Sequence, residues 1–286
     1  VFVPSLTTCL VVYLVRRLPP ERLNVAMGAY VSATVAGGLG GRLLAGFIHP
    51  PLHWRYAFVT ASAVLLLATI DAGRWLPREE KIPDAAGNEA GFAALLSRHD
   101  LLRIFSVAAA SFGAFSSVFN YLPFQLAGPP FLLPTGIITM LYLSYLVGVA
   151  VGPLAGRLGN RLGNGIAMAA GGGVFGASIL LTLLPSLLAV ATSLAGVCAG
   201  FFLVHTAAVG ALNRKLTTSR GRGNSLYVLF YYLGGTAGIT ASGLAYRRAG
   251  WRGVVVLVGL LLLIPVAAGI LEARADRPGR DGSGAP

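Results

Sequence analysis

Apolar stretches long enough to cross a lipid bilayer recur along the chain and are separated by short polar segments. A membrane-spanning helix needs about 20 mainly apolar residues, because a helix rises about 1.5 Å per residue and the hydrocarbon core is about 30 Å thick. The stretches of full length are residues 23–48, 54–75, 101–126, 135–155, 166–184, 187–212, 225–246 and 254–271. The pattern predicts an all-α polytopic membrane protein. Residues 1–15 are too short to span, and they predict a chain truncated within a helix.

Composition agrees with a membrane protein and argues against other classes. Only 11% of the residues are charged, against about 25% in an ordinary soluble domain. The net charge of +12 comes from basic residues between apolar runs, and not from one basic face, so we expect no nucleic-acid partner. Cys9 and Cys198 lie in apolar runs and are expected to be small buried residues. The sequence has no metal-ligand spacing, nucleophile–base pair or phosphate loop, so we expect no cofactor, metal or enzymatic activity.

Basic residues are distributed unequally between alternate loops. Seventeen of the 22 Lys and Arg residues fall in one set of loops and four in the other, and Arg42 lies inside a span. Cytoplasmic loops are enriched in Lys and Arg, so the first set and the C terminus are predicted to be cytoplasmic. Residues 76–100 would form a cytoplasmic linker, and residues 272–286 a disordered tail. Within the linker, helical spacing predicts an amphipathic helix on the membrane surface, formed by Phe92, Leu95, Leu96, His99 and Leu102.

One pattern of glycines occurs twice, 197 residues apart, and each copy is followed eight residues later by Trp-Arg. The copies are Gly37, Gly38, Gly41 and Gly46 with Trp54–Arg55, and Gly234, Gly235, Gly238 and Gly243 with Trp251–Arg252. The match indicates an internal duplication with six helices per unit. Residues 1–75 would hold the end of helix 4 and helices 5 and 6, and residues 101–271 would hold helices 7 to 12. The prediction is two parallel six-helix halves, here without the first three and a half helices.

These glycines resemble a motif of the major facilitator superfamily. The spacing of Gly28, Gly37 and Gly41 resembles the fifth-helix motif of its drug/proton antiporters, in which Gly46 also matches, although Arg42 stands where that motif has proline. A second resemblance is to the family's cytoplasmic loop signature, with Asn160 in place of aspartate; the matching residues are Gly156, Asn160, Arg161 and Gly163. Segments 37–46, 119–121, 199–205 and 225–234 resemble the YnfM-like branch.

The resemblance implies a function. It implies a monomeric secondary active transporter in the bacterial inner membrane, which exports small organic molecules by alternating access in exchange for protons. Two alternatives remain open: a partial gene product that does not transport, and an integral-membrane enzyme, for which no catalytic cluster is found. The family's packing of helix 5 on helix 8 further implies a seam between the halves. Small residues would let the two helices approach closely and slide during transport. The alternative is that these glycines serve static helix packing. The residues of this predicted seam are Gly28, Gly37, Gly41 and Gly46 on helix 5 and Gly148, Gly152 and Gly156 on helix 8.

Arg42 is the strongest candidate for a functional residue. A charge in the middle of a span costs about 2.5–3.5 kcal/mol unless it faces a cavity or a partner. We expect Arg42 to line the central cavity and to contact an anionic group of the substrate or of another helix. The alternative is that its side chain reaches the outer interface, some six residues away.

Further candidates for substrate binding or proton coupling lie at similar depth. His205 titrates near neutral pH in water and could couple to protons, although a structural histidine is the simpler interpretation. Several amphipathic side chains could bind a ligand of mixed polarity, although they could instead serve helix packing. These residues are Asn120, Tyr121 and Gln125 on helix 7 and Tyr227, Tyr231 and Tyr232 on helix 11. Asp71 is expected to pair with Arg74 on the same helix face.

Overall fold

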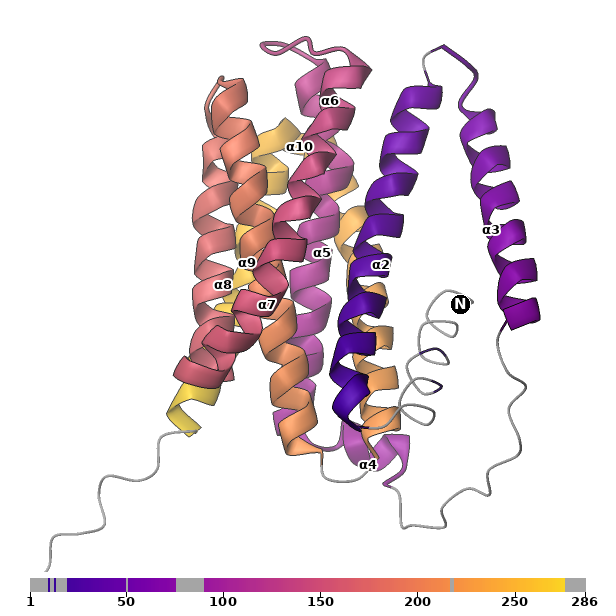
Figure 1. Cartoon of the computed structure of the whole chain (residues 1–286). Coiled ribbons are helices and arrows are strands. Elements are labelled where there is room, and N and C mark those ends of the chain that lie inside the picture. Colours follow the sequence, from indigo (N-terminus) through magenta and orange to yellow (C-terminus); the bar gives the residue numbers. More distant parts are fainter. Residues whose placement is uncertain are drawn as a thin grey trace, which may run out of the picture.

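The computed structural model describes Leu10, Tyr13 and residues 20–49, 51–75, 90–216 and 219–275, without the side chains of residues 20–32, Pro153 and Asn160. Every regular element in these ranges is a helix (Figure 1). Most of the predicted end of helix 4, the linker up to residue 89 and the tail from residue 276 lie outside the described residues.

The helices follow the predicted apolar stretches. In chain order they are α2 (Pro20–Ile48), α3 (Arg55–Trp75), α4 (Phe92–Leu96), α5 (His99–Ala127), α6 (Thr135–Leu141), η1 (Tyr142–Ser144), α7 (Tyr145–Leu162), α8 (Asn164–Leu180), η2 (Leu181–Leu183), α9 (Leu187–Lys215) and α10 (Arg220–Ala275). Six helical segments of the described part are long and apolar enough to cross a membrane. The eight predicted spans correspond to these six, to α2, and to a second arm of α10.

The two arms of α10 meet at a sharp break. The backbone at Ala249 and Gly250 is not helical, and Gly250 has a φ of 59°, which favours glycine because a Cβ is strained there. The next residue, Trp251, is buried and donates a 2.8 Å hydrogen bond from its indole Nε1 to the Thr182 hydroxyl. The first glycine copy is likewise followed by a break, between α2 and α3. The 56 residues of α10 therefore form two antiparallel spans, as the sequence predicts.

Helices α5, α8, α9 and α10 form a tightly packed bundle (Figure 1). The second glycine copy lies where α10 crosses α5: a Cβ on Gly238 would come within 2.6 Å of the Gly113 backbone. Gly171 and Gly200 make a similar contact between α8 and α9. Glycine is needed at these crossings because the backbones touch without intervening side chains.

Helices α2 and α3 lie outside this bundle, with α2 between α3 and α6 (Figure 1). The described side chains of α3 are almost all exposed, including large apolar ones such as Phe58, Leu65 and Leu67. An apolar helix with an apolar outer surface is typical of a membrane environment, where lipid replaces water.

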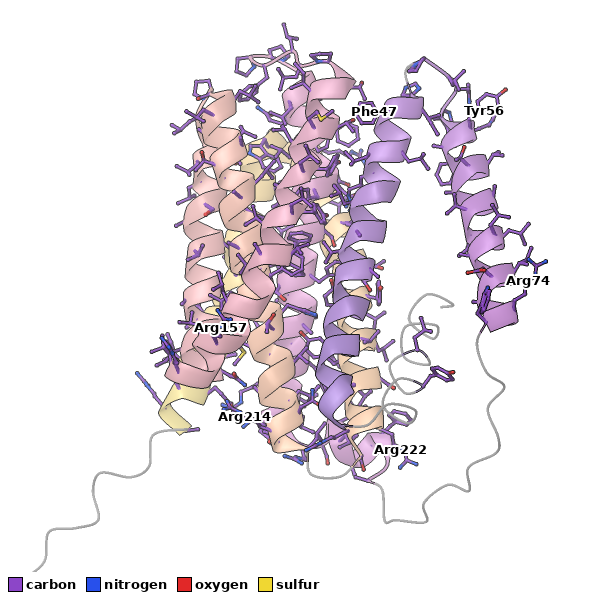
Figure 2. All side chains as sticks on the ribbon, in the orientation of Figure 1. Phe47, Tyr56, Arg74, Arg157, Arg214 and Arg222 are labelled. Carbon is purple, nitrogen blue, oxygen red and sulfur yellow. The ribbon has the colours of Figure 1, made fainter. Side chains whose placement is uncertain are left out.

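The two ends of the molecule differ in charge. Figure 2 shows Arg157, Arg214 and Arg222 at the lower end of the bundle, and Phe47 and Tyr56 at the opposite end. At the lower ends of α9 and α10, the half-buried Lys215 ammonium and the buried Glu272 carboxylate form an ion pair of 2.7 Å. The lower end is the one that the loop charges predict to be cytoplasmic, and we refer to it as the inner end.

Three local predictions need correction. The prediction of a surface helix is wrong in its extent, because α4 ends at Leu96, and two other predicted members, His99 and Leu102, belong to α5. Leu95 is buried against the inner end of the bundle and does not face a membrane surface. The predicted tail begins too early, because α10 continues to Ala275 and buries Glu272.

The third correction concerns Asp71 and Arg74. Both are exposed and the structure forms no ion pair between them. An exposed pair on one helix gains too little energy to fix two flexible side chains.

Candidate functional site

Arg42 lies within α2, about 9 Å before the outer end of that helix. Its guanidinium carbon lies 5.6 Å from the ring centre of Tyr142 and 5.1 Å from that of Tyr145, so the cation contacts two aromatic faces. One guanidinium nitrogen also donates to the Gly38 carbonyl, at 3.3 Å. The side chain is partly buried, so Arg42 joins the predicted first half to the predicted second half and does not simply extend outward.

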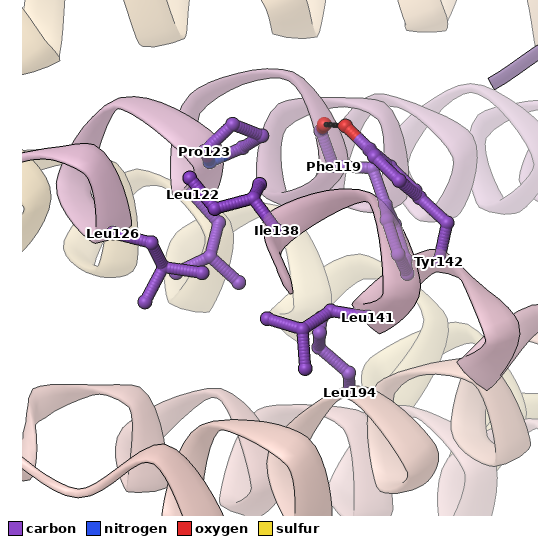
Figure 3. A pocket seen from close by; sticks show the side chains of 8 residues that line it. All are labelled: Phe119, Leu122, Pro123, Leu126, Ile138, Leu141, Tyr142 and Leu194. Atoms are coloured by element: carbon purple, nitrogen blue, oxygen red, sulfur yellow. Dashed lines mark hydrogen bonds between the residues drawn. The ribbon is translucent and has the colours of Figure 1, made fainter. Parts of the chain in front are cut away.

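A proline explains why Tyr142 is fixed in this position. Pro123 lies inside α5 and has no N–H, so the carbonyl of Phe119, four residues earlier, lacks its helical partner. The Tyr142 hydroxyl donates to that carbonyl at 3.1 Å, as Figure 3 shows. In an apolar setting an unpaired carbonyl is costly, so this bond stabilises both α5 and the orientation of Tyr142. The apolar pocket beside the bond is small, and it is lined by Phe119, Leu122, Pro123, Leu126, Ile138, Leu141, Tyr142 and Leu194 (Figure 3).

Aromatic side chains continue from Arg42 into the bundle. Tyr145 meets Phe115 at 5.4 Å between ring centres, Phe115 stacks on Phe201 at 4.1 Å, and Phe201 lies 5.9 Å from the ring of His205. We call this set, which crosses α5, η1, α7, α9 and α10, the aromatic row; its members are Tyr142, Tyr145, Phe115, Phe201, His205, Tyr227, Tyr231 and Phe112.

His205 lies at the inner part of this row. Its Nδ1 is 3.0 Å from the Tyr227 hydroxyl, and its ring lies 5.4 Å from that of Tyr231. Tyr231 in turn stacks on Phe112 at 3.7 Å. Three of the predicted candidates, His205, Tyr227 and Tyr231, therefore lie together, and Arg42 is connected to them through Tyr145 and two phenylalanines.

The candidates on helix 7 lie apart from the row. Asn120 is exposed and donates to the Ser116 carbonyl of its own helix at 2.7 Å. Tyr121 packs against Tyr246 near the outer end. Gln125 lines a separate outer pocket together with Trp251 and Arg252. The helical spacing placed these three residues on α5 correctly, but α5 does not direct them to the aromatic row.

The glycine seam is only partly assembled. Gly46 lies against Thr139 of α6, so this one position makes a close contact between the halves. Among the described residues, four of the predicted glycines have no heavy atom of another element within 4 Å of the position a Cβ would take: Gly37, Gly41, Gly152 and Gly156. Gly148 faces Phe202 of α9, so its assignment to a contact with α2 is corrected. For Gly28 the structure describes a helical backbone alone.

The cytoplasmic loop motif closes the turn between α7 and α8. Gly163 adopts a φ of 87° and its N–H bonds to the Gly159 carbonyl, which ends α7. Asn164 is buried, and in the amide orientation that satisfies its neighbours its oxygen accepts from the Ala211 N–H at 2.6 Å and from Arg214 at 3.0 Å. Arg161 is exposed, Gly156 lies within α7, and the side chain of Asn160 is outside the described set. The motif therefore contributes to fixing the inner ends of α7, α8 and α9.

Sequence reasoning missed Tyr142 and Tyr145, the residues that contact Arg42. The available signal was Pro123, because a proline within an apolar span frees a carbonyl that another helix must satisfy. Among the described residues there is no group of three His, Cys, Asp or Glu side chains placed to hold a metal ion.

Comparison with known proteins agrees with the helical architecture. The family model described as Major Facilitator Superfamily matches residues 1–141 and 132–285. The Uncharacterized MFS-type transporter YybF of Bacillus subtilis is 26% identical over 259 residues, which cover 88% of this chain and 63% of that protein. The Inner membrane transport protein YnfM of Escherichia coli is 27% identical over 261 residues, covering 90% and 63%. The chain thus spans less than two thirds of the length of these relatives.

Proposed function

Because this chain belongs to the Major Facilitator Superfamily, we propose that it acts, within its full-length gene product, as a secondary active transporter that exports small organic molecules in exchange for protons. Relatives named as transporters support transport in preference to catalysis. We place the protein in the bacterial inner membrane, where the name of one relative places that relative, and the distribution of basic loops supports a cytoplasmic C terminus. We assign residues 1–75 and 101–271 to two halves of one monomer, joined by the linker 76–100.

The observation that carries this proposal is the uneven contact between α2 and the segment formed by α6, η1 and α7. Gly46 and Arg42 contact that segment near its outer end. Below this level α7 diverges from α2 toward the inner end (Figure 1), and no atom of the described side chains or backbone of another element lies within 4 Å of a Cβ placed on Gly152 or Gly156. Alternating access requires two halves that are in contact at one end of the molecule and separated at the other. The glycines Gly28, Gly37 and Gly41 would then meet α7 only in the opposite state.

Cysteine cross-linking tests this alternation. Gly46→Cys with Thr139→Cys makes an outer pair, because a Cβ on Gly46 would lie 2.8 Å from the Thr139 Cβ. Gly28→Cys with Gly156→Cys makes an inner pair, because both positions lie about 30 Å from the outer ends of their segments. In a Cys9→Ala, Cys198→Ala background we expect efficient cross-linking of the outer pair and little of the inner pair, with the balance reversed when substrate or a pH gradient changes the state. Equal cross-linking of both pairs under all conditions would contradict a moving seam.

We further propose that His205 carries the exchanged proton. It is the side chain in the aromatic row whose ordinary pKa in water lies near neutral pH, and the Tyr227 hydroxyl is 3.0 Å from its Nδ1. The acids with described side chains, Asp71, Asp100 and Glu272, lie near the inner ends of their helices.

The test is transport by the full-length protein in proteoliposomes with an imposed pH gradient. We expect His205→Gln to abolish gradient-driven transport and to retain substrate exchange without a gradient. His53→Gln, at an exposed outer turn, is the matched control and should behave as wild type. Gradient-driven transport that persists in His205→Gln would place the proton site elsewhere. No transport of any probe by wild type would favour the partial, non-transporting gene product.

A further inference from the structure

Arg42 is a cation near the outer end of the candidate site without a carboxylate partner among the described side chains. The two ion pairs among the described residues join Arg98 to Asp100 and Lys215 to Glu272, and neither includes Arg42. Asp71, on the neighbouring α3, lies about 24 Å from the outer end of its helix, whereas Arg42 lies about 9 Å from the outer end of α2. The charge is therefore held by tyrosine faces and a backbone carbonyl, contacts that leave its positive charge uncompensated.

The internal duplication indicates that the helix itself does not require this arginine. At the equivalent position of the second copy, 197 residues later, the chain has Ile239 between the same glycines. That copy packs closely against α5 through Gly234 and Gly238. An aliphatic residue thus suffices where the pattern serves packing alone, and a charge within a span is costly. The difference between the copies argues that Arg42 serves a ligand.

We propose that the transported molecule carries an anionic group, a carboxylate or a group of similar shape, which Arg42 binds beside an aromatic or apolar body. This inference rests on the proposed transport function. A guanidinium presents a planar fork of donors that matches a carboxylate with two hydrogen bonds. The rings of Tyr142 and Tyr145 lie beside the guanidinium, and the buried rings of Phe115 and Phe119 pack behind Tyr145. The site therefore offers a charged end next to the partly exposed ring of Tyr142.

Binding of three matched probes tests this assignment. Benzoate, benzamide and benzylamine share one ring and differ in charge, and longer arylalkyl acids, amides and amines extend the series. We expect the acids to raise the melting temperature of the purified full-length protein and the amides and amines to leave it unchanged. Arg42→Gln should weaken binding of the acids by about 10- to 100-fold, because a hydrogen-bonded charge pair is lost. Arg42→Lys should weaken it less, since it retains the charge and loses the fork.

Controls separate the outcomes. Arg55→Gln removes an exposed arginine outside the outer end of α2 and should bind the acids as wild type does. Each variant must retain the melting temperature of the ligand-free wild type, so that lost binding does not report unfolding. Equal stabilisation by amides or amines, or unchanged acid binding in Arg42→Gln, would overturn the assignment. If the acid binds but does not move into or out of vesicles, the proposed transport function fails while the assignment of Arg42 to anion binding stands.

Discussion

Replacing Gly238 with valine is expected to destabilise the bundle strongly, whereas the same change at Gly41 leaves its stability unaltered. The two glycines occupy equivalent positions in the repeated pattern. A Cβ at 238 would lie 2.6 Å from the Cα and the carbonyl oxygen of Gly113, both backbone atoms that cannot move without separating α5 from α10. Around a Cβ placed at 41, no heavy atom of another element lies within 4 Å in the part of the chain that the structure describes. Overpacking of this kind costs about 3 kcal/mol, which corresponds to a decrease in Tm of about 6–12 °C.

Thermal melting of detergent-purified protein, combined with the yield of monodisperse protein, measures this difference. Gly238→Ala is an intermediate test, because even a methyl group must displace the Gly113 backbone. Transport is not the readout here, since Gly41 belongs to the proposed seam and its substitution can impair movement without lowering stability. A Gly238→Val protein as stable as Gly41→Val would show that the helix crossing is looser than the backbone contact implies.

Removing the ammonium of Lys215 is the second change with a large expected effect. Lys215→Met leaves the Glu272 carboxylate buried and without its cation, with only 6% of that side chain exposed. Breaking a buried pair from one side costs about 3 kcal/mol or more, because the remaining charge is not solvated. Glu272→Leu should cost less, since Lys215 is 22% exposed and also interacts with Asp100.

The double variant Lys215→Met, Glu272→Leu provides the control for this prediction. A well-packed apolar pair can replace a buried ion pair at little cost, so we expect the double variant to lie within about 1 kcal/mol of wild type. Chemical denaturation of the four proteins in the cycle gives the coupling energy between the two side chains. Additive losses in the double variant would mean that the two groups act independently, despite the 2.7 Å distance.

Most of the fold is predictable from the sequence because the bilayer restricts a spanning chain to apolar helices of a set length. The predicted spans, including the two arms of α10, agree with the observed helices to within a few residues, except that α7 continues beyond the predicted end at residue 155 to Leu162. The errors lie at the inner end, where polar residues are buried by contacts remote in sequence. Leu95 belongs to one buried cluster with Leu212 and Tyr227, and Glu272 pairs with Lys215. Nothing in the sequence near Leu95 or Glu272 indicates these distant partners.

The site is predictable only for residues whose chemistry is unusual within a span. Arg42 and His205 stand out because a charge or an imidazole is costly among apolar side chains. Tyr145 and Phe115 do not, because aromatic residues in a span are common and their contacts depend on how helices cross. Tyr142 is fixed by a carbonyl that Pro123 leaves free on another helix, so its role follows from two residues that the sequence separates by 19 positions.

The break at Gly250 has a consequence for how the protein is made. Its tight turn joins two spans into a hairpin, and the segment around that turn carries Arg247, Arg248 and Arg252. With the C terminus in the cytoplasm, as proposed, these three charges must be translocated against a membrane potential that is negative inside. That work is about 7 kcal/mol per 100 mV. The potential therefore opposes insertion of this hairpin, and the hydrophobic gain of its two arms, entering together, must exceed that cost.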